Sequence, residues 1–345
     1  MKSGDKYGAH RVISPKGVLP QAAERIDNSM EIYDNEILVD VKTLNVDSAS
    51  FTQIEEEAGH DTDKISRIIL NTVKTRGKQH NPVTGSGGMF MGTIAEIGPA
   101  LIDKVTVRPG DFIASLVSLS TTPLVIDKIV EIRPDRDQVD IVGRAILFES
   151  GIYVVLPDDL PQSVALAVLD VAGAAAQTAR LVGPGDTVFI IGAGGKSGML
   201  CAYEAKRRAG VTGTVIGTGH SRASTQRITE LGFCDHVIQV DAANPIEVER
   251  EVSRLTDGRM ADITINCVNI PNTEMGSILA TKNNGLIYFF SMATSFTKAA
   301  LGAEGIASDA TMIIGNGYTR GHAEISLNIL RECPALREIF MELYA

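Results

Sequence analysis

Short apolar runs recur through the second half of the chain and predict its strands. They stand at residues 187–191, 214–217, 262–266 and 285–290. A helix is predicted over residues 199–209, between the first two runs. Strands that alternate with helical stretches at this spacing indicate a parallel, doubly wound α/β sheet of the Rossmann type.

The first half of the chain has a different pattern. Residues 36–44, 92–98 and 111–117 alternate apolar and polar positions or run apolar, with turn signals such as Pro109-Gly110 between them. This pattern predicts a partly open β-barrel. We expect a catalytic barrel-like domain over residues 1–165, completed by helices of residues 316–345, and a dinucleotide-binding domain over residues 166–315. The boundary, near residues 161–169, is expected to be a packed helix.

A glycine-rich turn follows the run at 187–191. Its residues are Gly192, Gly194, Gly195, Lys196, Ser197 and Gly198. Glycines allow a sharp turn and a close approach of the backbone to phosphates, and the first N–H groups of the next helix point at the negative charge. Such turns also occur without a nucleotide, but the alternating strands and helices around this one favour a site for a dinucleotide pyrophosphate.

Length and charge restrict the class of protein. A chain of 345 residues with 44% hydrophobic content is long and apolar enough for two cores. The formal charge of −10 argues against nucleic acid as a partner. Neither a membrane-spanning run nor the apolar core of a signal peptide is visible, so a cytoplasmic location is expected. The cysteines contain no C-x-x-C pair and predict no disulfide framework.

The order of these signals resembles the medium-chain dehydrogenase/reductase superfamily over nearly the whole chain. The resemblance is carried by residues 36–42, 87–98, 107–113 and 181–192. It implies a GroES-like barrel joined to a Rossmann domain that binds NAD or NADP.

The resemblance fails at the metal ligands of the zinc alcohol dehydrogenases in this superfamily. Their Gly-His-Glu is replaced here by Gly87, Gly88 and Met89, and the other two ligand positions fall on or near Asp47 and Asp170. A pair of aspartates without His or Cys makes a poor zinc site. We therefore predict no catalytic metal.

Loss of the Lewis acid changes the expected substrate. Oxidation of an amine carbon develops positive charge, which carboxylates stabilise and zinc would oppose. Asp47 and Asp170 would suit an ammonium group if they face the nicotinamide. The alternative, of comparable weight, is that Asp47 is a turn or cap residue and Asp170 a charge on a helix surface.

A narrower resemblance supports the amine. Residues 4–23, 31–40, 45–54, 81–89 and 192–198 are similar to the L-erythro-3,5-diaminohexanoate dehydrogenases of lysine fermentation. The resemblance implies that the 3-amino group of this diamino acid is oxidised with NAD(P)⁺ and hydrolysed to 5-amino-3-oxohexanoate, ammonia and NAD(P)H. A homo-oligomer, dimer or tetramer, is expected because medium-chain members commonly form them.

Such a substrate needs partners for two ammonium groups and one carboxylate. The candidate ammonium partners and catalytic residues are Asp47, Glu149 and Asp170, with Asp47 as the first choice for the acid/base. The candidate carboxylate partners are Arg144, Arg76 and His80, although the last two could simply belong to a solvated loop. Thr84 and Ser86 are candidates for lining the pocket or for turn hydrogen bonds. A carboxylate that acts near neutral pH needs a raised pKa, which burial or another acid would supply.

Cofactor preference is read at the end of the second Rossmann strand. The position that carries an acid in NAD-preferring sites falls on Gly219, between Thr218 and the pair Ser221 and Arg222, which could bind a 2′-phosphate. We therefore expect NADP to be accepted, while the resembled family indicates NAD. Further cofactor contacts are expected at the carboxyl ends of later strands: Asn266, Cys267, Val268, Ser291 and Met292. Ordinary strand-end packing is their alternative.

Two other functional classes stay open. Zinc-free members of the superfamily include quinone and enoyl reductases that use NADPH, but the many candidate charged groups count against an apolar substrate pocket. A regulator that binds NADP without turnover is the second, because fold resemblance does not establish catalysis.

Overall fold

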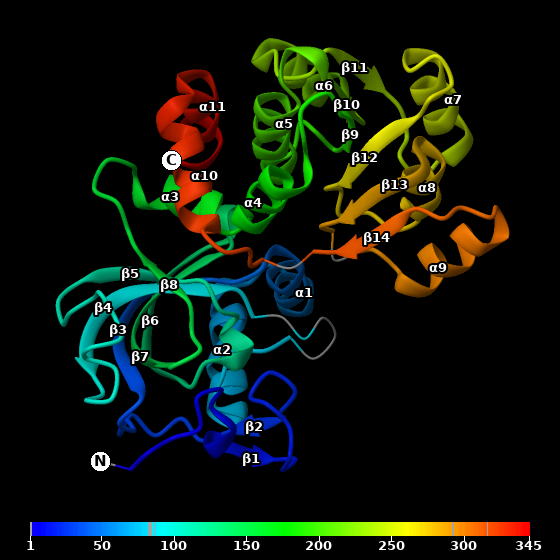
Figure 1. Cartoon of the computed structure of the whole chain (residues 1–345). Coiled ribbons are helices and arrows are strands. Elements are labelled where there is room, and N and C mark those ends of the chain that lie inside the picture. Colours follow the sequence, from blue (N-terminus) through cyan, green and yellow to red (C-terminus); the bar gives the residue numbers. More distant parts are fainter. Residues whose placement is uncertain (1, 82–84, 86, 292, 316) are drawn as a thin grey trace. The chain divides into compact units, whose positions relative to one another are not determined.

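The computed structural model describes residues 2–81, 85, 87–291, 293–315 and 317–345. It divides the chain into two compact units, Met1–Gln162 and Ser163–Ala345 (Figure 1). Each unit has its own sheet and its own hydrophobic core.

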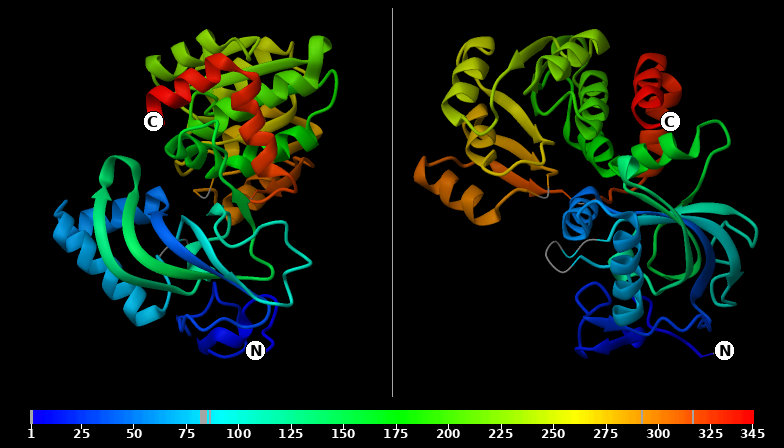
Figure 2. Two further views of the ribbon diagram at one scale, coloured as in Figure 1. Left: turned by 90° about the vertical axis from the view of Figure 1, so that its left-hand side faces the viewer. Right: turned by 180° about the vertical axis from the view of Figure 1, so that it is seen from behind.

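The first unit is built on a six-stranded antiparallel sheet in the order β6-β7-β3-β4-β5-β8. Its strands are β3 (Glu36–Asn45), β4 (Met89–Ile97), β5 (Phe112–Ser115), β6 (Leu124–Arg133), β7 (Gln138–Phe148) and β8 (Tyr153–Val155). Irregular registers interrupt the β3–β4, β3–β7 and β6–β7 pairings. Such bulges bend strands, and the sheet curls into the predicted partly open barrel (Figure 2).

The remaining elements of the first unit precede or cover the sheet. They are η1 (Ala9–Arg11), β1 (Val12–Ser14), β2 (Arg25–Ile26), α1 (Ser48–Ala58), α2 (Thr62–Arg76), η2 (Leu119–Thr121) and η3 (Pro134–Arg136). Helices α1 and α2 begin at aspartate N-caps, Asp47 and Asp61. Each ends at a left-handed glycine, Gly59 or Gly77, which releases the chain from the helix without a Cβ clash.

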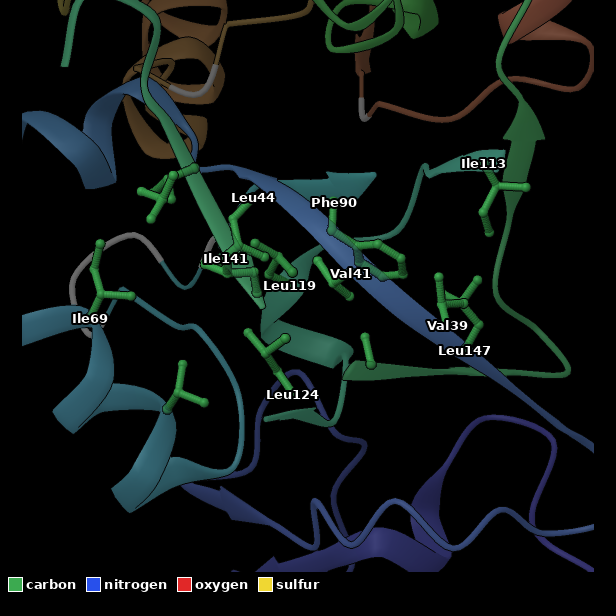
Figure 3. Close-up of a cluster of buried hydrophobic side chains, with 14 of the residues drawn as sticks. Val39, Val41, Leu44, Ile69, Phe90, Ile113, Leu119, Leu124, Ile141 and Leu147 are labelled. Carbon is green, nitrogen blue, oxygen red and sulfur yellow. The ribbon is translucent and has the colours of Figure 1, made fainter. Parts of the chain in front are cut away.

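Alternation along β3 decides which face of the barrel is its core. Val39 and Val41 are buried, whereas Asp40 and Lys42 between and beside them are exposed. Figure 3 shows Val39 and Val41 in one cluster with Phe90 of β4, and Ile69 of α2 belongs to the same cluster. Burial of these apolar side chains, at about 1.5–3 kcal/mol each, holds the helices against the sheet.

The second unit contains a six-stranded parallel sheet in the order β11-β10-β9-β12-β13-β14. Its strands are β9 (Thr187–Ile191), β10 (Thr214–Gly219), β11 (His236–Gln239), β12 (Ala261–Asn266), β13 (Thr281–Phe289) and β14 (Thr311–Ile314). Numbered within the unit, this is the Rossmann order 3-2-1-4-5-6. The predicted doubly wound sheet is confirmed.

Helices cover both faces of the parallel sheet. They are α3 (Gln162–Leu169), α4 (Ala172–Leu181), α5 (Lys196–Ala209), α6 (Arg222–Leu231), α7 (Pro245–Leu255), α8 (Glu274–Ala280), α9 (Phe296–Gly305), α10 (His322–Glu332) and α11 (Pro334–Tyr344), with the short η4 (Gly210–Thr212). Along β9, Val188 and Ile190 pack with α4, α5 and α6, whereas Phe189 and Ile191 pack with α7 and α8. Apolar residues at consecutive positions therefore reflect a strand buried on both faces.

The C-terminal helices differ from expectation. Residues 316–345 were expected to complete the first domain, but α10 and α11 lie within the second unit. Ser326 of α10 donates a hydrogen bond to the carbonyl of Ala172 in α4, and Glu332 accepts from Tyr203 and Arg207 of α5. An amphipathic pattern shows that a helix has a partner without showing which one.

Among the described residues, no single helix is both long and apolar enough to cross a bilayer. Only the bent pair α3 and α4, taken together, meets the criterion of length and composition.

Candidate functional site

The glycine-rich turn connects β9 to α5 at the switch point of the parallel sheet. Gly192 follows the last residue of β9 and has a φ of +83°, a conformation that favours glycine. Gly195 is the N-cap of α5 and contributes no side-chain cap. The first N–H groups of α5 therefore lack a side-chain acceptor, which suits them to bind an anion.

The glycines of this turn are required by close backbone contacts. A Cβ added to Gly198 would lie 2.0 Å from the carbonyl oxygen of Gly192, and one added to Gly194 would lie 2.7 Å from that of Ser224. Arg227 of α6 donates to the Gly194 carbonyl oxygen over 2.8 Å. The turn is thus packed tightly against α5 and α6.

Asp170 lies between α3 and α4 and is paired with the glycine-rich turn. The Nζ of Lys196 donates to its Oδ2 over 2.8 Å, and both side chains are about one third exposed. Asp170 therefore already has a cationic partner, which weakens its case as a receptor for a substrate ammonium group. Lys196 was predicted to contact the cofactor phosphates, and this ion pair engages its ammonium group. Ser197, a second predicted cofactor residue, is buried in the first turn of α5.

The end of β10 is where a 2′-phosphate contact was predicted. Gly219 is the last residue of the strand, so no acid stands there. Ser221 caps α6 and forms a reciprocal capping box with Ser224. Arg222, the first helical residue, is exposed and makes no ion pair among the described residues. The neighbouring Thr218 is buried.

The side chains predicted to contact the cofactor at the carboxyl end of β12 point to different places. Asn266 is fully buried; its amide donates to Thr273 and Ser277 over 2.8 and 3.0 Å. This side chain is turned into the protein, contrary to the expectation that it lies along the cofactor, because its hydrogen bonds hold α8 to β12. Half-buried Val268 lies against Gly192, since a Cβ there would come within 2.5 Å of its Cγ1.

Cys267 and Ser291, at the ends of β12 and β13, are half-buried. The Sγ of Cys267 lies 3.9 Å from the Sγ of Cys201 in α5. Ser291 follows β13 and accepts a hydrogen bond from the backbone N–H of Ala293 over 3.1 Å. Met292 lies outside the described residues.

Asp47, the first choice for the acid/base, caps α1. Its Oδ1 accepts from the backbone N–H of Ser50 over 3.1 Å, and its Oδ2 accepts from the Ser50 hydroxyl. Gly88 lies directly beside it, because a Cβ on that glycine would come within 2.7 Å of the Asp47 nitrogen. The alternative interpretation as a cap residue is confirmed. One carboxylate can cap a helix and still exchange protons, so the catalytic role stays a prediction.

Glu149 and Arg144 are placed away from Asp47. Glu149 follows β7 at the end paired with Glu36, whereas Asp47 follows the opposite end of the ten-residue strand β3. At about 3.3 Å per residue, roughly 30 Å of strand separates these two ends of β3, more than one small substrate spans. Lys104 and Asn35 bind Glu149 and lower its pKa. The assignment of Glu149 to the same site as Asp47 is wrong, because the apolar run before it simply ends in a turn.

Arg144 lies in the middle of β7 rather than at a strand end. It is exposed, opposite Asp40 of β3, on the face of the sheet that alternation turns away from the core. The prediction that Arg144 binds the substrate carboxylate is therefore wrong. Thr84 and Ser86 lie outside the described residues.

A polar cavity of about 290 Å³ lies between α1, α2 and the segment after α2. Its lining includes Arg76 and His80, and also Gln79, which was not predicted from the sequence. Burial, together with the positive charges of Lys78 and Arg76, lowers the pKa of His80 to about 4. A lone glutamine in a polar loop carries no sequence signal, so only its burial in the structure reveals it.

In the described part of the chain, no group of three or more His, Cys, Asp or Glu side chains is arranged to hold a metal ion.

Comparison with known proteins gives relatives over the full length. Residues 10–157 match the family model described as the L-erythro-3,5-diaminohexanoate dehydrogenase N-terminal domain. The L-erythro-3,5-diaminohexanoate dehydrogenase of Acetoanaerobium sticklandii is 61% identical, covering 99% of this chain and 99% of its own. The protein of the same name from Fusobacterium nucleatum is 58% identical and covers 100% of both chains.

Solved structures share the fold at low identity. The CurK enoyl reductase has a TM-score of 0.57 at 15% identity, covering 93% of this chain and 86% of its own. Escherichia coli quinone oxidoreductase in complex with NADPH has a TM-score of 0.52 at 16% identity, covering 88% and 80%. These likenesses confirm the pairing of a barrel with a Rossmann sheet.

Proposed function

The chain belongs to the L-erythro-3,5-diaminohexanoate dehydrogenase family, and we propose that it oxidises the 3-amino group of this diamino acid with a nicotinamide dinucleotide. The products would be 5-amino-3-oxohexanoate, ammonia and NAD(P)H. The observation that carries the proposal is the 61% identity to a relative of that name, which extends over 99% of both chains. The proposal includes a place in lysine fermentation, independence from zinc, and assembly into a homo-oligomer.

The second unit would hold the cofactor. In support, the glycine-rich turn presents the uncapped N-terminus of α5 beside Val268. When bound, NAD⁺ or NADP⁺ supplies the acceptor for the hydride that leaves the C3 carbon. Gly192, Gly194, Gly195 and Gly198 would let the backbone approach the pyrophosphate.

The first unit would hold the amine and move its protons. Loss of hydride from C3 of the neutral amine leaves a protonated imine, to which water adds before ammonia departs. A carboxylate near this carbon stabilises the positive charge and accepts the proton of the attacking water. Half-buried Asp47, beside Gly88, is our candidate for this role.

The variant Asp47→Asn removes the negative charge of residue 47 and keeps an oxygen that can cap α1. The amide oxygen of asparagine can still accept from the N–H of Ser50, so we expect the thermal stability to be preserved. Loss of the proton acceptor should lower kcat/KM by about 100-fold. The matched control is Asp61→Asn, because Asp61 caps the neighbouring helix α2 through Asp63 and Lys64. Near-normal turnover of Asp47→Asn would remove this residue from the mechanism.

Arg222→Met tests how the 2′-phosphate is recognised. We expect Kd for NADP⁺ to rise about 10-fold while Kd for NAD⁺ stays unchanged, because only NADP⁺ carries a group that pairs with the guanidinium. Calorimetric titration of both dinucleotides measures this. Arg250→Met, which removes an exposed arginine from α7, is the control. Equal weakening of both dinucleotides would contradict the assignment.

A substrate panel tests the proposed function against the reductase alternative. Purified protein would be assayed with erythro-3,5-diaminohexanoate and either oxidised dinucleotide, and separately with quinones or enoyl thioesters and NADPH. We expect turnover only with the diamino acid. Turnover only in the reductase assays would replace the proposal with the second class.

A further inference from the structure

The cavity between α1 and α2 is built from polar side chains although both helices pack on an apolar core. Six of its lining residues carry the argument: Gln53, Glu57, Arg76, Gln79, His80 and Asn81. Asn81 is fixed there by donating to the Oε1 of Gln53 over 2.9 Å. The volume of about 290 Å³ is near the lower end for small-molecule sites and suits a small amino acid.

Arg76 brings a positive charge to this cavity. It is the last residue of α2 and is half-buried. Among the described residues, no carboxylate lies within ion-pairing distance of its guanidinium; its Nη1 lies 3.5 Å from the Nδ1 of His80. A partly desolvated cation gains from an anionic partner, and a guanidinium binds a carboxylate through two parallel hydrogen bonds.

Gln79 contributes a hydrogen-bond acceptor without a donor, its side-chain oxygen, to the wall of this cavity. Its side chain is only 2% exposed, and its Oε1 has no hydrogen-bond donor among the residues that the structure describes. A buried polar atom without a partner destabilises the protein by about 1–3 kcal/mol, so its presence in a cavity wall points to a ligand that donates an N–H or O–H.

We propose that this cavity receives a β-amino acid, with its carboxylate on Arg76 and its amine donating to the Oε1 of Gln79. The inference rests on the proposed function and names the residues that would hold the substrate of that reaction. Glu57, exposed on α1 at the same cavity, suits the second ammonium group of a diamino acid. The Gln79 oxygen, the Arg76 guanidinium and the Glu57 carboxylate together complement a zwitterion better than a quinone.

The neighbouring titratable groups leave one positive charge for the carboxylate. His80 is neutral at pH 7, since its pKa is lowered to about 4. The Nζ of Lys78 donates instead to the carbonyl oxygens of Pro20 and Gln21, over 2.5 and 3.0 Å. The guanidinium of Arg76 is therefore the cation that remains to pair with the ligand.

Arg76→Met tests the carboxylate contact. The readout is the ratio of kcat/KM for 3,5-diaminohexanoate to that for its carboxamide, in which the negative charge is absent. We expect the wild type to favour the acid and the variant to lose at least 10-fold in this ratio, through a higher KM for the acid. Arg76→Lys should recover part of the ratio, because it restores the charge without the bidentate geometry.

Controls separate this contact from a structural role. Arg67→Met removes an exposed cation from the same helix and should leave the ratio unchanged. If Arg76 only stabilised the end of α2, its loss would lower Tm and leave the ratio as in the wild type, which would overturn the inference while the proposed function stands. If the wild type turns over neither compound, the proposed function fails, and the inference fails with it. Should Arg76→Met not fold, the ratio measured for Arg76→Gln decides.

Discussion

Replacing Gly198 by alanine is expected to bring dinucleotide binding and turnover below detection. The new Cβ would stand 2.0 Å from the Gly192 carbonyl oxygen and 2.7 Å from the Cα of Ala193. Both are backbone atoms, so the clash cannot be relieved by a change of rotamer. The turn must move away from α5, and the N–H groups that would hold the pyrophosphate move with it.

Gly305→Ala is the matched control for this effect. Gly305 ends α9, and nothing lies within 4 Å of a Cβ added there. It should bind NAD⁺ and NADP⁺ as the wild type does, with equal or slightly greater stability. Calorimetric titration and thermal unfolding of the two variants distinguish loss of the site from loss of the fold. Undiminished binding by Gly198→Ala would contradict a pyrophosphate site at this turn.

Replacing Arg11 by methionine is expected to destabilise the protein by about 3–5 kcal/mol. Arg11 and Glu36 are each about 1% exposed and form a two-pronged ion pair, with distances of 2.7 and 2.6 Å. The guanidinium also donates to the carbonyls of Ser29 and Glu31. Removing it leaves the buried Glu36 carboxylate with only His10 and the backbone N–H of Tyr33 as partners, and it removes the main link between the N-terminal segment and β3.

Urea unfolding measures this loss. Arg11→Met combined with Glu36→Leu should recover much of it, because the double variant no longer buries an unpaired charge. Arg25→Met, which removes an exposed arginine from β2, should change the free energy of unfolding by less than about 0.5 kcal/mol. A loss below about 1 kcal/mol for Arg11→Met would show that solvent reaches Glu36 and that the pair is not a structural anchor.

The features best predicted from the sequence depend on local backbone chemistry. The glycine-rich turn begins directly after β9, at Gly192, because tight turns and close backbone contacts leave few alternatives to glycine. The absence of an acid at the end of β10 was likewise predicted from the sequence, and Gly219 is the last residue of that strand. Fold class followed from alternation in the first half and consecutive apolar residues in the second.

Features that depend on register and packing partners were not predictable in this way. Glu149 and Asp47 each follow a strand, but only the antiparallel pairing of β3 with β7 shows that they stand at opposite ends of it. Asn266 ends a parallel strand, yet its side chain is used by Thr273 and Ser277. Gln79 is recognised as a candidate substrate-binding residue only from its burial and its unpaired side-chain oxygen in the structure.

We propose that this chain couples amine oxidation to reduction of a nicotinamide dinucleotide without a metal, and one assay tests this directly. Chelator-treated protein would be given erythro-3,5-diaminohexanoate with NAD⁺ or NADP⁺, and reduced dinucleotide and ammonia would be measured together over time. We predict that the two products appear in equal amounts and at a rate unaffected by chelation. Tight binding of the dinucleotide without formation of either product would contradict the account.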